Sequence, residues 1–142
     1  RSAIRNGPVA LLPSNPAVTM HDPKTILLAE DEDLFRSMLA DLLRFDDYNV
    51  LEAGNGDEAV SAADAHSGRI DLVITDINLH GMTGLELASR LRADRWRFPI
   101  LLITAAPSPA IVTRATPLGI ETVLRKPFAE SDIVAFVEGL AD

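Results

Sequence analysis

Five carboxylate, hydroxyl and ammonium side chains stand where short apolar runs of the sequence end. Each run is rich in Val, Ile and Leu, which indicates a buried strand. The polar residues are Glu30, Asp31, Asp76, Thr104 and Lys126. In an open parallel sheet, ligands bind beyond the carboxyl ends of the strands. We therefore expect these residues, far apart in sequence, to lie together at one edge of a sheet.

The chemistry that suits this set is phosphoryl transfer to a carboxylate. Neighbouring carboxylates destabilise one another unless a cation joins them. Oxygen ligands without histidine or cysteine select a hard ion, most simply Mg²⁺, with Mn²⁺ as a substitute. A carboxylate can act as a nucleophile and form an aspartyl phosphate. Metal, lysine and hydroxyl groups would then neutralise the phosphoryl oxygens.

Strand and helix signals alternate five times from Lys24 onward. Apolar runs predict strands, and three- and four-residue apolar spacing predicts helices. The expected strands cover 25–29, 48–53, 71–75, 99–104 and 121–125, and the clearer helices cover 34–45, 57–65, 85–93 and 133–140. Three prolines around 110–116 leave room there for only a short or irregular helix. This alternation predicts an α/β fold, a doubly wound five-stranded parallel sheet with helices on both faces.

The first of these helices is expected to be amphipathic. Leu34, Met38, Leu42 and Phe45 recur at helical spacing and mark its apolar stripe. Asp33 is the expected N-cap, and the acidic residues at the start of the helix are favourable for the helix dipole.

Composition limits the class of protein. The chain has 142 residues, 47% of them hydrophobic, and no cysteine, so neither disulfides nor thiolate metal sites are available. Its net charge of -8 argues against a nucleic-acid partner. No apolar run is long enough for membrane insertion, and a cytoplasmic location is expected. Residues 1–23 carry four prolines and no periodicity, which predicts a disordered tail, a linker or a remnant of expression before a domain over 24–142.

From Lys24 to Asp142 the sequence resembles the receiver domain of two-component response regulators. The resemblance rests on the acidic pair of LLAEDE, the Asp of LVITDINLHGMTGLEL, the Thr of ILLITAA and the Lys-Pro of LRKPF. It implies a flavodoxin-like sheet with strand order 2-1-3-4-5. The family often has a cis peptide before this proline, here between Lys126 and Pro127.

The resemblance also assigns roles to the candidate residues. Asp76 would take a phosphoryl group from a histidine kinase or a histidine phosphotransfer protein. Asp31 would bind Mg²⁺ directly with Glu30 assisting, and Asp76 and the Asn78 backbone carbonyl would complete the protein ligands. Thr104 would hydrogen-bond the phosphoryl group and Lys126 would pair with it. Output would pass to a downstream protein, either from a stand-alone regulator or from the carboxyl-terminal receiver of a hybrid kinase.

Four features depart from the family pattern. Glu30 stands where aspartate is common, and His80 stands where proline is usual in the loop after Asp76. Val123 takes the place of an aromatic residue that normally moves inward with the threonine. The proline-broken segment 107–117 covers a helix that commonly changes its surface on activation. We expect the phosphoryl chemistry to be retained and signal transmission to be altered.

Two other functions compete with a phosphorylated receiver. A pseudo-receiver keeps the fold as an interaction module, but such domains usually lose the acceptor aspartate, the acidic pair or the lysine, all of which are present here. Phosphatases similar to haloacid dehalogenases also form an aspartyl phosphate. Their nucleophile lies on the first strand in a DxD-type motif, whereas this first strand ends in Glu30-Asp31 and leaves little chain for a cap region.

Overall fold

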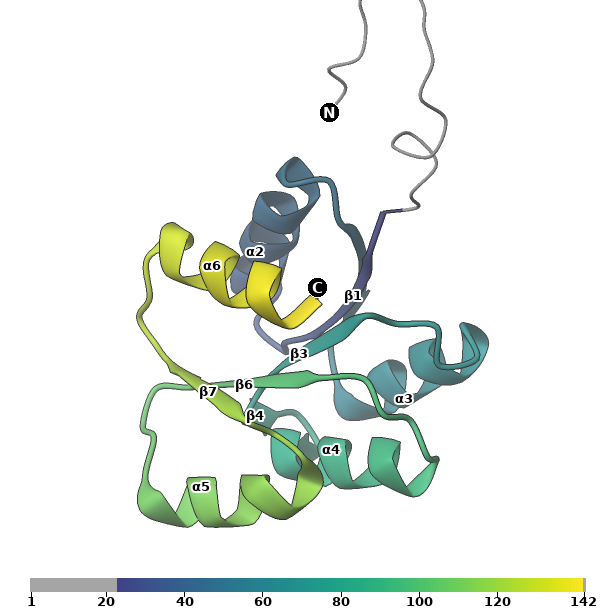
Figure 1. Cartoon of the computed structure of the whole chain (residues 1–142), viewed down its shortest axis with the longest axis vertical. Helices are drawn as coiled ribbons and strands as arrows, with labels where there is room; N and C mark the ends of the chain where they lie inside the picture. The colour runs from purple at the N-terminus through teal and green to yellow at the C-terminus, as the bar shows by residue number, and fades with distance from the viewer. Residues whose placement is uncertain (1–22, 142) are drawn as a thin grey trace, which may run out of the picture.

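Five parallel strands form one sheet in the order β2-β1-β3-β6-β7, which confirms the predicted fold and strand order (Figure 1). The computed structural model describes residues 23–141, so the predicted tail lies, apart from Pro23, outside the described residues. The strands are β1 (Thr25–Ala29), β2 (Asn49–Ala53), β3 (Leu72–Asp76), β6 (Ile100–Thr104) and β7 (Thr122–Arg125).

Helices cover both faces of this sheet. On one face lie α2 (Asp33–Phe45) and α6 (Glu130–Ala141), and on the other lie α3 (Gly56–Ala65), α4 (Gly84–Ala93) and α5 (Pro109–Ala115). Alternate residues of each strand enter the two cores because successive side chains of a strand point to opposite faces. In β1, for example, Ile26 and Leu28 pack under α2 and α6, while Leu27 and Ala29 pack under α3 and α4.

The apolar stripe predicted for α2 is largely wrong. Leu34, Met38 and Phe45 are exposed, by 78%, 58% and 86%, and only Leu42 of the predicted stripe packs against the core. The sheet is covered instead by a second apolar stripe, made of Leu39, Ala40 and Leu43. Helical spacing identified the helix, but two stripes fit that spacing and the sheet selects one of them.

The start of α2 also differs from the prediction. The N-cap is Glu32, which makes no side-chain capping hydrogen bond, and Asp33 is the first helical residue. Asp33 instead pairs with Arg36 one turn further along the helix, with 2.9 Å between Oδ1 and Nη2.

The proline-rich segment after β6 forms the short, irregular helix that was predicted. Helix α5 has seven residues, begins after Ser108 and passes into a 3-10 turn, Thr116–Leu118. The Ser108 hydroxyl accepts a hydrogen bond from the Ile111 amide at 3.3 Å. Gly119 ends the turn with φ 75°, in the left-handed region that favours glycine.

A small antiparallel hairpin after β3 was not predicted. It joins β4 (Asn78–Leu79) to β5 (Met82–Thr83) through a turn at His80 and Gly81. Two-residue strands are too short to leave a periodic signal in the sequence. The hairpin fixes the loop that follows Asp76.

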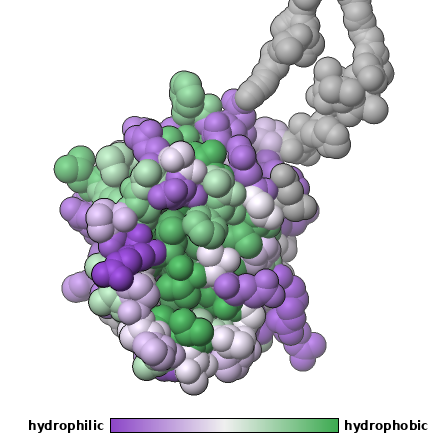
Figure 2. Space-filling model, turned by 60° about the vertical axis from the view of Figure 1, so that its left-hand side comes forward, coloured by the Kyte–Doolittle hydropathy of each residue, from purple (hydrophilic) through white to green (hydrophobic). Residues whose placement is uncertain are grey.

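One side of the molecule presents apolar surface. Seen from the side that carries α6 and α5, hydrophobic residues gather in a band down the middle of the face, flanked by hydrophilic ones (Figure 2). Within residues 23–141, no helix is both long and apolar enough to cross a bilayer.

Gly84, the first residue of α4, lies directly against the backbone of Asp76. A Cβ atom at this position would lie 2.4 Å from the Asp76 carbonyl oxygen and 3.1 Å from Ile77 Cα. The Gly84 amide also donates to the Ile77 carbonyl at 2.7 Å. Backbone atoms cannot move aside as the end of a flexible side chain can, so the close approach of α4 to β3 requires glycine.

We expect Gly84→Ala to lower the free energy of unfolding by about 1–3 kcal/mol, because overpacking displaces backbone. Gly139→Ala is the matched control: it lies within α6, a Cβ atom there meets nothing within 4 Å, and replacing glycine in a helix should raise stability by about 0.5–1 kcal/mol. Urea unfolding of both variants measures the two effects. Equal stability of Gly84→Ala and the wild type would contradict the assigned contact.

Candidate functional site

Asp76 ends β3, the central strand of the sheet, and its side chain is buried at 7% exposure. The Asn78 amide donates a 2.8 Å hydrogen bond to Oδ1 of Asp76. The other carboxylate oxygen, Oδ2, contacts the Nζ atom of Lys126. Both oxygens are therefore held, and the carboxylate has one fixed orientation at the carboxyl end of the sheet.

Lys126 reaches this carboxylate from the end of β7. Its amide donates to the Thr104 carbonyl at 2.8 Å, which continues the pairing of β7 with β6. Its Nζ atom lies 3.4 Å from Oε1 of Glu30 and 4.4 Å from the centre of the Phe35 ring. The ammonium group thus touches two carboxylates and an aromatic face, an arrangement that favours its charged form. The peptide between Lys126 and Pro127 is cis, as predicted.

Glu30, the residue after β1, is buried at 3% exposure and turns inward toward Asp76 and Lys126. Its Oε2 atom accepts a hydrogen bond from the Glu32 amide at 3.0 Å. Its backbone carbonyl accepts from Nη1 of Arg36 at 2.8 Å, one turn into α2. Glu30 is therefore fixed through both its side chain and its backbone.

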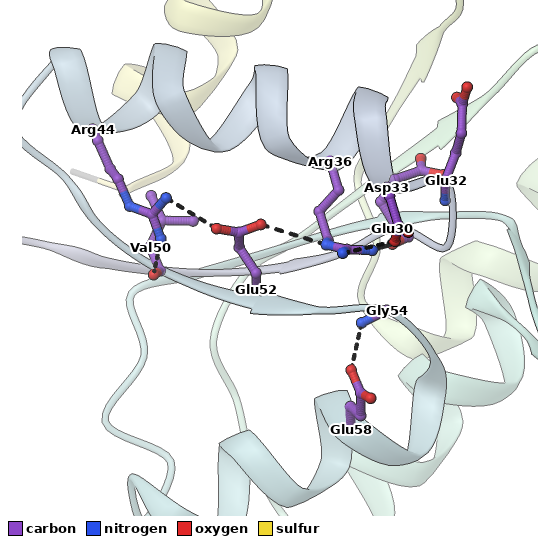
Figure 3. A network of polar contacts seen from close by, with 9 residues as sticks. All are labelled: Glu30, Glu32, Asp33, Arg36, Arg44, Val50, Glu52, Gly54 and Glu58. Carbon is purple, nitrogen blue, oxygen red and sulfur yellow. Dashed lines mark hydrogen bonds and ion pairs between the residues drawn. The ribbon is translucent and has the colours of Figure 1, made fainter.

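Arg36 belongs to a chain of charges that joins α2 to the edge strand β2 (Figure 3). Its Nε atom lies 3.4 Å from Oε1 of Glu52, and Oε2 of Glu52 lies 2.9 Å from Nη1 of Arg44. Arg44 in turn donates to the Val50 carbonyl at 3.0 Å. Networked pairs hold side chains at a lower entropic cost than isolated pairs, and this network keeps α2 in register with the strands beneath it.

Burial and charge shift two pKa values in the pocket. Burial raises the pKa of Glu30 from 4.5 to about 7; the hydrogen bond and charge of Asp76 add to the rise, while the Glu32 amide and Lys126 oppose it. Burial disfavours the Lys126 ammonium, but its hydrogen bond with Asp76 and the charges of Asp76 and Glu30 outweigh burial and raise the Lys126 pKa. The charged form of Lys126 is thus favoured, and the pKa of Glu30 lies near neutrality.

The remaining predicted site residues lie around this core. Asp31 is exposed beside Glu30, and Thr104 is buried at the end of β6. The Thr104 hydroxyl accepts from the Ala106 amide at 3.1 Å. Asn78 is exposed at the start of the hairpin. The structure thus joins Glu30, Asp76 and Lys126 by direct contact, leaves Asp31 and Asn78 exposed, and buries Thr104 at the end of the neighbouring strand.

Sequence reasoning missed three residues that shape the pocket, namely Phe35, Arg36 and Gly84. Phe35 and Arg36 lie in the first turn of α2, directly after the acidic run. Their position next to that run was the sequence signal that could have linked them to the pocket. Phe35 packs edge-on against Phe128, with ring centres 6.0 Å apart. For Gly84, the sequence indicated only a glycine in the loop before a predicted helix.

Two departures from the family pattern can now be placed. His80 is exposed at the turn of the β4–β5 hairpin. Val123 is half-buried in β7 and packs against the core that lies under α3, α4 and α5. A valine at this position lacks the length of an aromatic ring, so it has little reach between a buried and an exposed position.

The fold and the pocket together define a doubly wound α/β domain with polar and charged side chains at the carboxyl ends of its strands. The chain belongs to the response regulator receiver domain family, whose model matches residues 26–138. Receiver domains of this family are signalling domains of two-component systems.

Individual relatives agree with this assignment. The transcriptional regulatory protein PdtaR of Mycobacterium tuberculosis is 39% identical over 117 residues, which cover 82% of this chain and 56% of PdtaR. The chemotaxis protein CheY of Pseudomonas aeruginosa is 34% identical over 106 residues, 72% of this chain and 84% of CheY. The chain spans about half the length of several curated relatives that it matches.

Solved structures show the same architecture. Chemotaxis protein CheY4 of Vibrio cholerae aligns with a TM-score of 0.77 and 28% identity over 83% of this chain and 98% of that chain. The HemR receiver domain of Leptospira biflexa aligns with a TM-score of 0.77 and 27% identity over 84% of this chain and 94% of that chain.

The raised pKa of Glu30 predicts a pH dependence of stability without metal. Because the folded-state pKa of about 7 lies above the ordinary value of 4.5, the protonated acid stabilises the fold. This contribution is complete below about pH 4.5 and is lost as the pH rises through 7. Between pH 5 and pH 8, the wild type should therefore lose free energy of unfolding relative to Glu30→Gln. Urea unfolding of both proteins in EDTA measures this difference. A difference that stays constant with pH would refute this assignment.

Proposed function

We propose that this receiver domain accepts a phosphoryl group from a phosphohistidine donor onto Asp76. The observation that carries the proposal is the buried Asp76 carboxylate, held by the Asn78 amide and joined to Lys126 and Glu30. A structural aspartate at a strand end needs neither burial nor a half-buried lysine partner. Perturbed, coupled groups of this kind are typical of functional sites.

The proposed reaction exchanges one phosphorus bond for another. A carboxylate oxygen of Asp76 attacks the phosphorus atom, the bond from phosphorus to the donor imidazole nitrogen breaks, and the imidazole keeps that electron pair. Lys126 then balances the negative charge of the phosphoryl oxygens. The Thr104 hydroxyl, at the end of the neighbouring strand, is the proposed second donor to them.

The donor set of the pocket fits Mg²⁺ or, as a substitute, Mn²⁺. Within residues 23–141 no three His, Cys, Asp or Glu side chains form a ready-made metal cluster. Magnesium, however, needs only one or two carboxylates beside water and phosphate oxygens. Asp31 and Asp76, with Glu30 and the Asn78 carbonyl, are the proposed ligands. When bound, the ion would neutralise the charge that develops on the transferred group.

An apolar groove beside Lys126 is the proposed docking site of the donor protein. Its volume is about 280 Å³, and it is lined by Phe35, Met38, Leu39, Leu42, Lys126, Pro127, Phe128 and Glu130. Lys126 belongs to both the groove and the pocket, so a protein seated in the groove would bring its histidine close to Asp76. The exposed Leu34 and Met38 would gain a partner in this complex.

The proposed reaction is tested by intact-mass measurement with acetyl phosphate and Mg²⁺. The wild-type domain should gain a single phosphoryl adduct, and beryllofluoride with Mg²⁺ should change its NMR spectrum. Asp76→Asn should abolish both responses, whereas Asp33→Asn, at an exposed acid, should leave them intact. Absence of any adduct together with unchanged spectra would instead indicate a pseudo-receiver.

The docking site is tested by separating protein donors from small ones. The phosphoryl donor is a histidine phosphotransfer protein that phosphorylates the wild type. Met38→Asp should slow transfer from this protein about tenfold, because it places charge in an apolar contact. Phosphorylation by acetyl phosphate should be unchanged. Phe45→Asp adds the same charge to the same helix at an exposed residue outside the groove, and should have little effect. Equal slowing by both variants would contradict docking in the groove.

A further inference from the structure

The end of the sheet opposite the phosphoacceptor pocket carries two adjoining hollows walled by arginine. They have volumes of about 430 Å³ and 230 Å³ and share Arg92, Arg97 and Gly119 as lining residues. They lie where α4 ends, where β6 begins and where the chain passes from the 3-10 turn into β7. We propose that these hollows bind a small phosphate-type oxyanion.

Arg92 holds one wall of the site in place. Its Nε atom donates to the Leu118 carbonyl at 2.7 Å, and its Nη1 atom donates to the carbonyls of Trp96 and Phe98 at 2.8 Å each. These bonds use the hydrogens of Nε and Nη1 and leave those of Nη2. The Nη2 atom faces Gly119, where an added Cβ atom would lie 3.6 Å away, and makes no hydrogen bond to the described residues. A guanidinium that is fixed through Nε and Nη1 and keeps Nη2 free is a pre-organised donor.

Arg97 supplies the second positive charge. Its side chain is exposed, and its one hydrogen bond within the described residues is a 3.3 Å contact from Nη1 to the Trp96 carbonyl. Arg92 and Arg97 line the same two hollows, and burial and then the charge of Arg97 lower the pKa of Arg92. An anion between them would offset both charges.

Neither arginine has an acidic partner. Among residues 23–141, no ion pair involves Arg92 or Arg97, although the chain as a whole carries a net charge of -8. The one carboxylate that lines either hollow is Glu121. An acidic protein that leaves two neighbouring guanidinium groups unpaired retains positive charge at this place.

The chemistry of two guanidinium groups favours a doubly charged tetrahedral oxyanion. Guanidinium forks match phosphate oxygens in paired hydrogen bonds. The left-handed Gly119 leaves the approach to Nη2 open, because it has no side chain. Inorganic phosphate and a phosphomonoester share this chemistry.

Occupancy of this site would not compete with the phosphoacceptor pocket. The strand β6 runs from Ile100 at the hollows to Thr104 at the pocket, a separation of about 13 Å at the usual rise per residue. The ligand would instead contact the turn that leads into β7, the strand that carries Lys126. The inference therefore stands independently of phosphorylation at Asp76.

Trp96 provides a local readout, because it is the single tryptophan of the chain and its carbonyl contacts both arginines. Sodium phosphate is added to the domain in EDTA, at an ionic strength held constant with sodium chloride, and tryptophan fluorescence and backbone amide NMR shifts are recorded. We expect a saturable response, with shifts at the Gly119 amide and none at the Thr104 or Ala106 amides. Glycerol 3-phosphate in a parallel titration distinguishes a phosphomonoester from the free ion by its affinity.

Arg97→Gln should weaken phosphate binding by at least tenfold and leave acetyl phosphate labelling of Asp76 unchanged. Arg90→Gln is the matched control. It removes an exposed arginine in the last turn of α4, the turn that carries Arg92, and Arg90 lines neither hollow. This variant should bind phosphate as the wild type does. A response that does not saturate, that sodium chloride reproduces, or that is equally weakened in both variants would overturn the proposal. If acetyl phosphate does not label Asp76 in the wild type, that result counts against the proposed function and not against this site.

Discussion

The contact of Lys126 with two buried carboxylates is the interaction on which the rest of the structure depends. Glu30 and Asp76 come from adjacent strands, and both are almost fully removed from water. Two buried carboxylates repel each other, and removing either one from water is costly. The ammonium group of Lys126 offsets this cost because it lies within reach of both. Lys126 thereby holds the two carboxylates together at the carboxyl end of the sheet.

The architecture around the pocket serves to fix these three side chains. Pairing of β7 with β6 extends through the Lys126 amide, so the lysine begins from a defined backbone position. Arg36 holds the backbone of Glu30 from α2, and Glu52 and Arg44 hold Arg36 in place from the edge strand. Gly84 lets α4 approach the Asp76 backbone closely. Elements from the whole domain thus converge on a site that occupies only the ends of its central strands.

Much of this arrangement could be predicted from the sequence, and the failures have physical causes. Strands buried on both faces leave continuous apolar runs, so the parallel sheet and the meeting of Glu30, Asp76 and Lys126 followed from local patterns. The strand order followed from the resemblance to receiver domains. The buried stripe of α2 did not follow from local patterns, because helical spacing is satisfied equally by Met38 and Leu42 and by Leu39 and Leu43. The β4–β5 hairpin is too short to be periodic. Arg36 acts through the backbone, and a contact between a side chain and a distant carbonyl leaves no signature in residue type.

The replacement of aspartate by Glu30 illustrates how such a pocket tolerates a longer side chain. The Glu30 side chain is held at both oxygens: Oε2 accepts from the Glu32 amide, and Oε1 faces Lys126. This geometry keeps Glu30 inside the pocket and leaves Asp31 exposed beside it. Adjacent acids thereby divide into a buried group that shares the lysine with Asp76 and a solvated group that is accessible to an incoming cation. Glu30 thus carries the cost of burial, and Asp76 and Lys126 stay in contact.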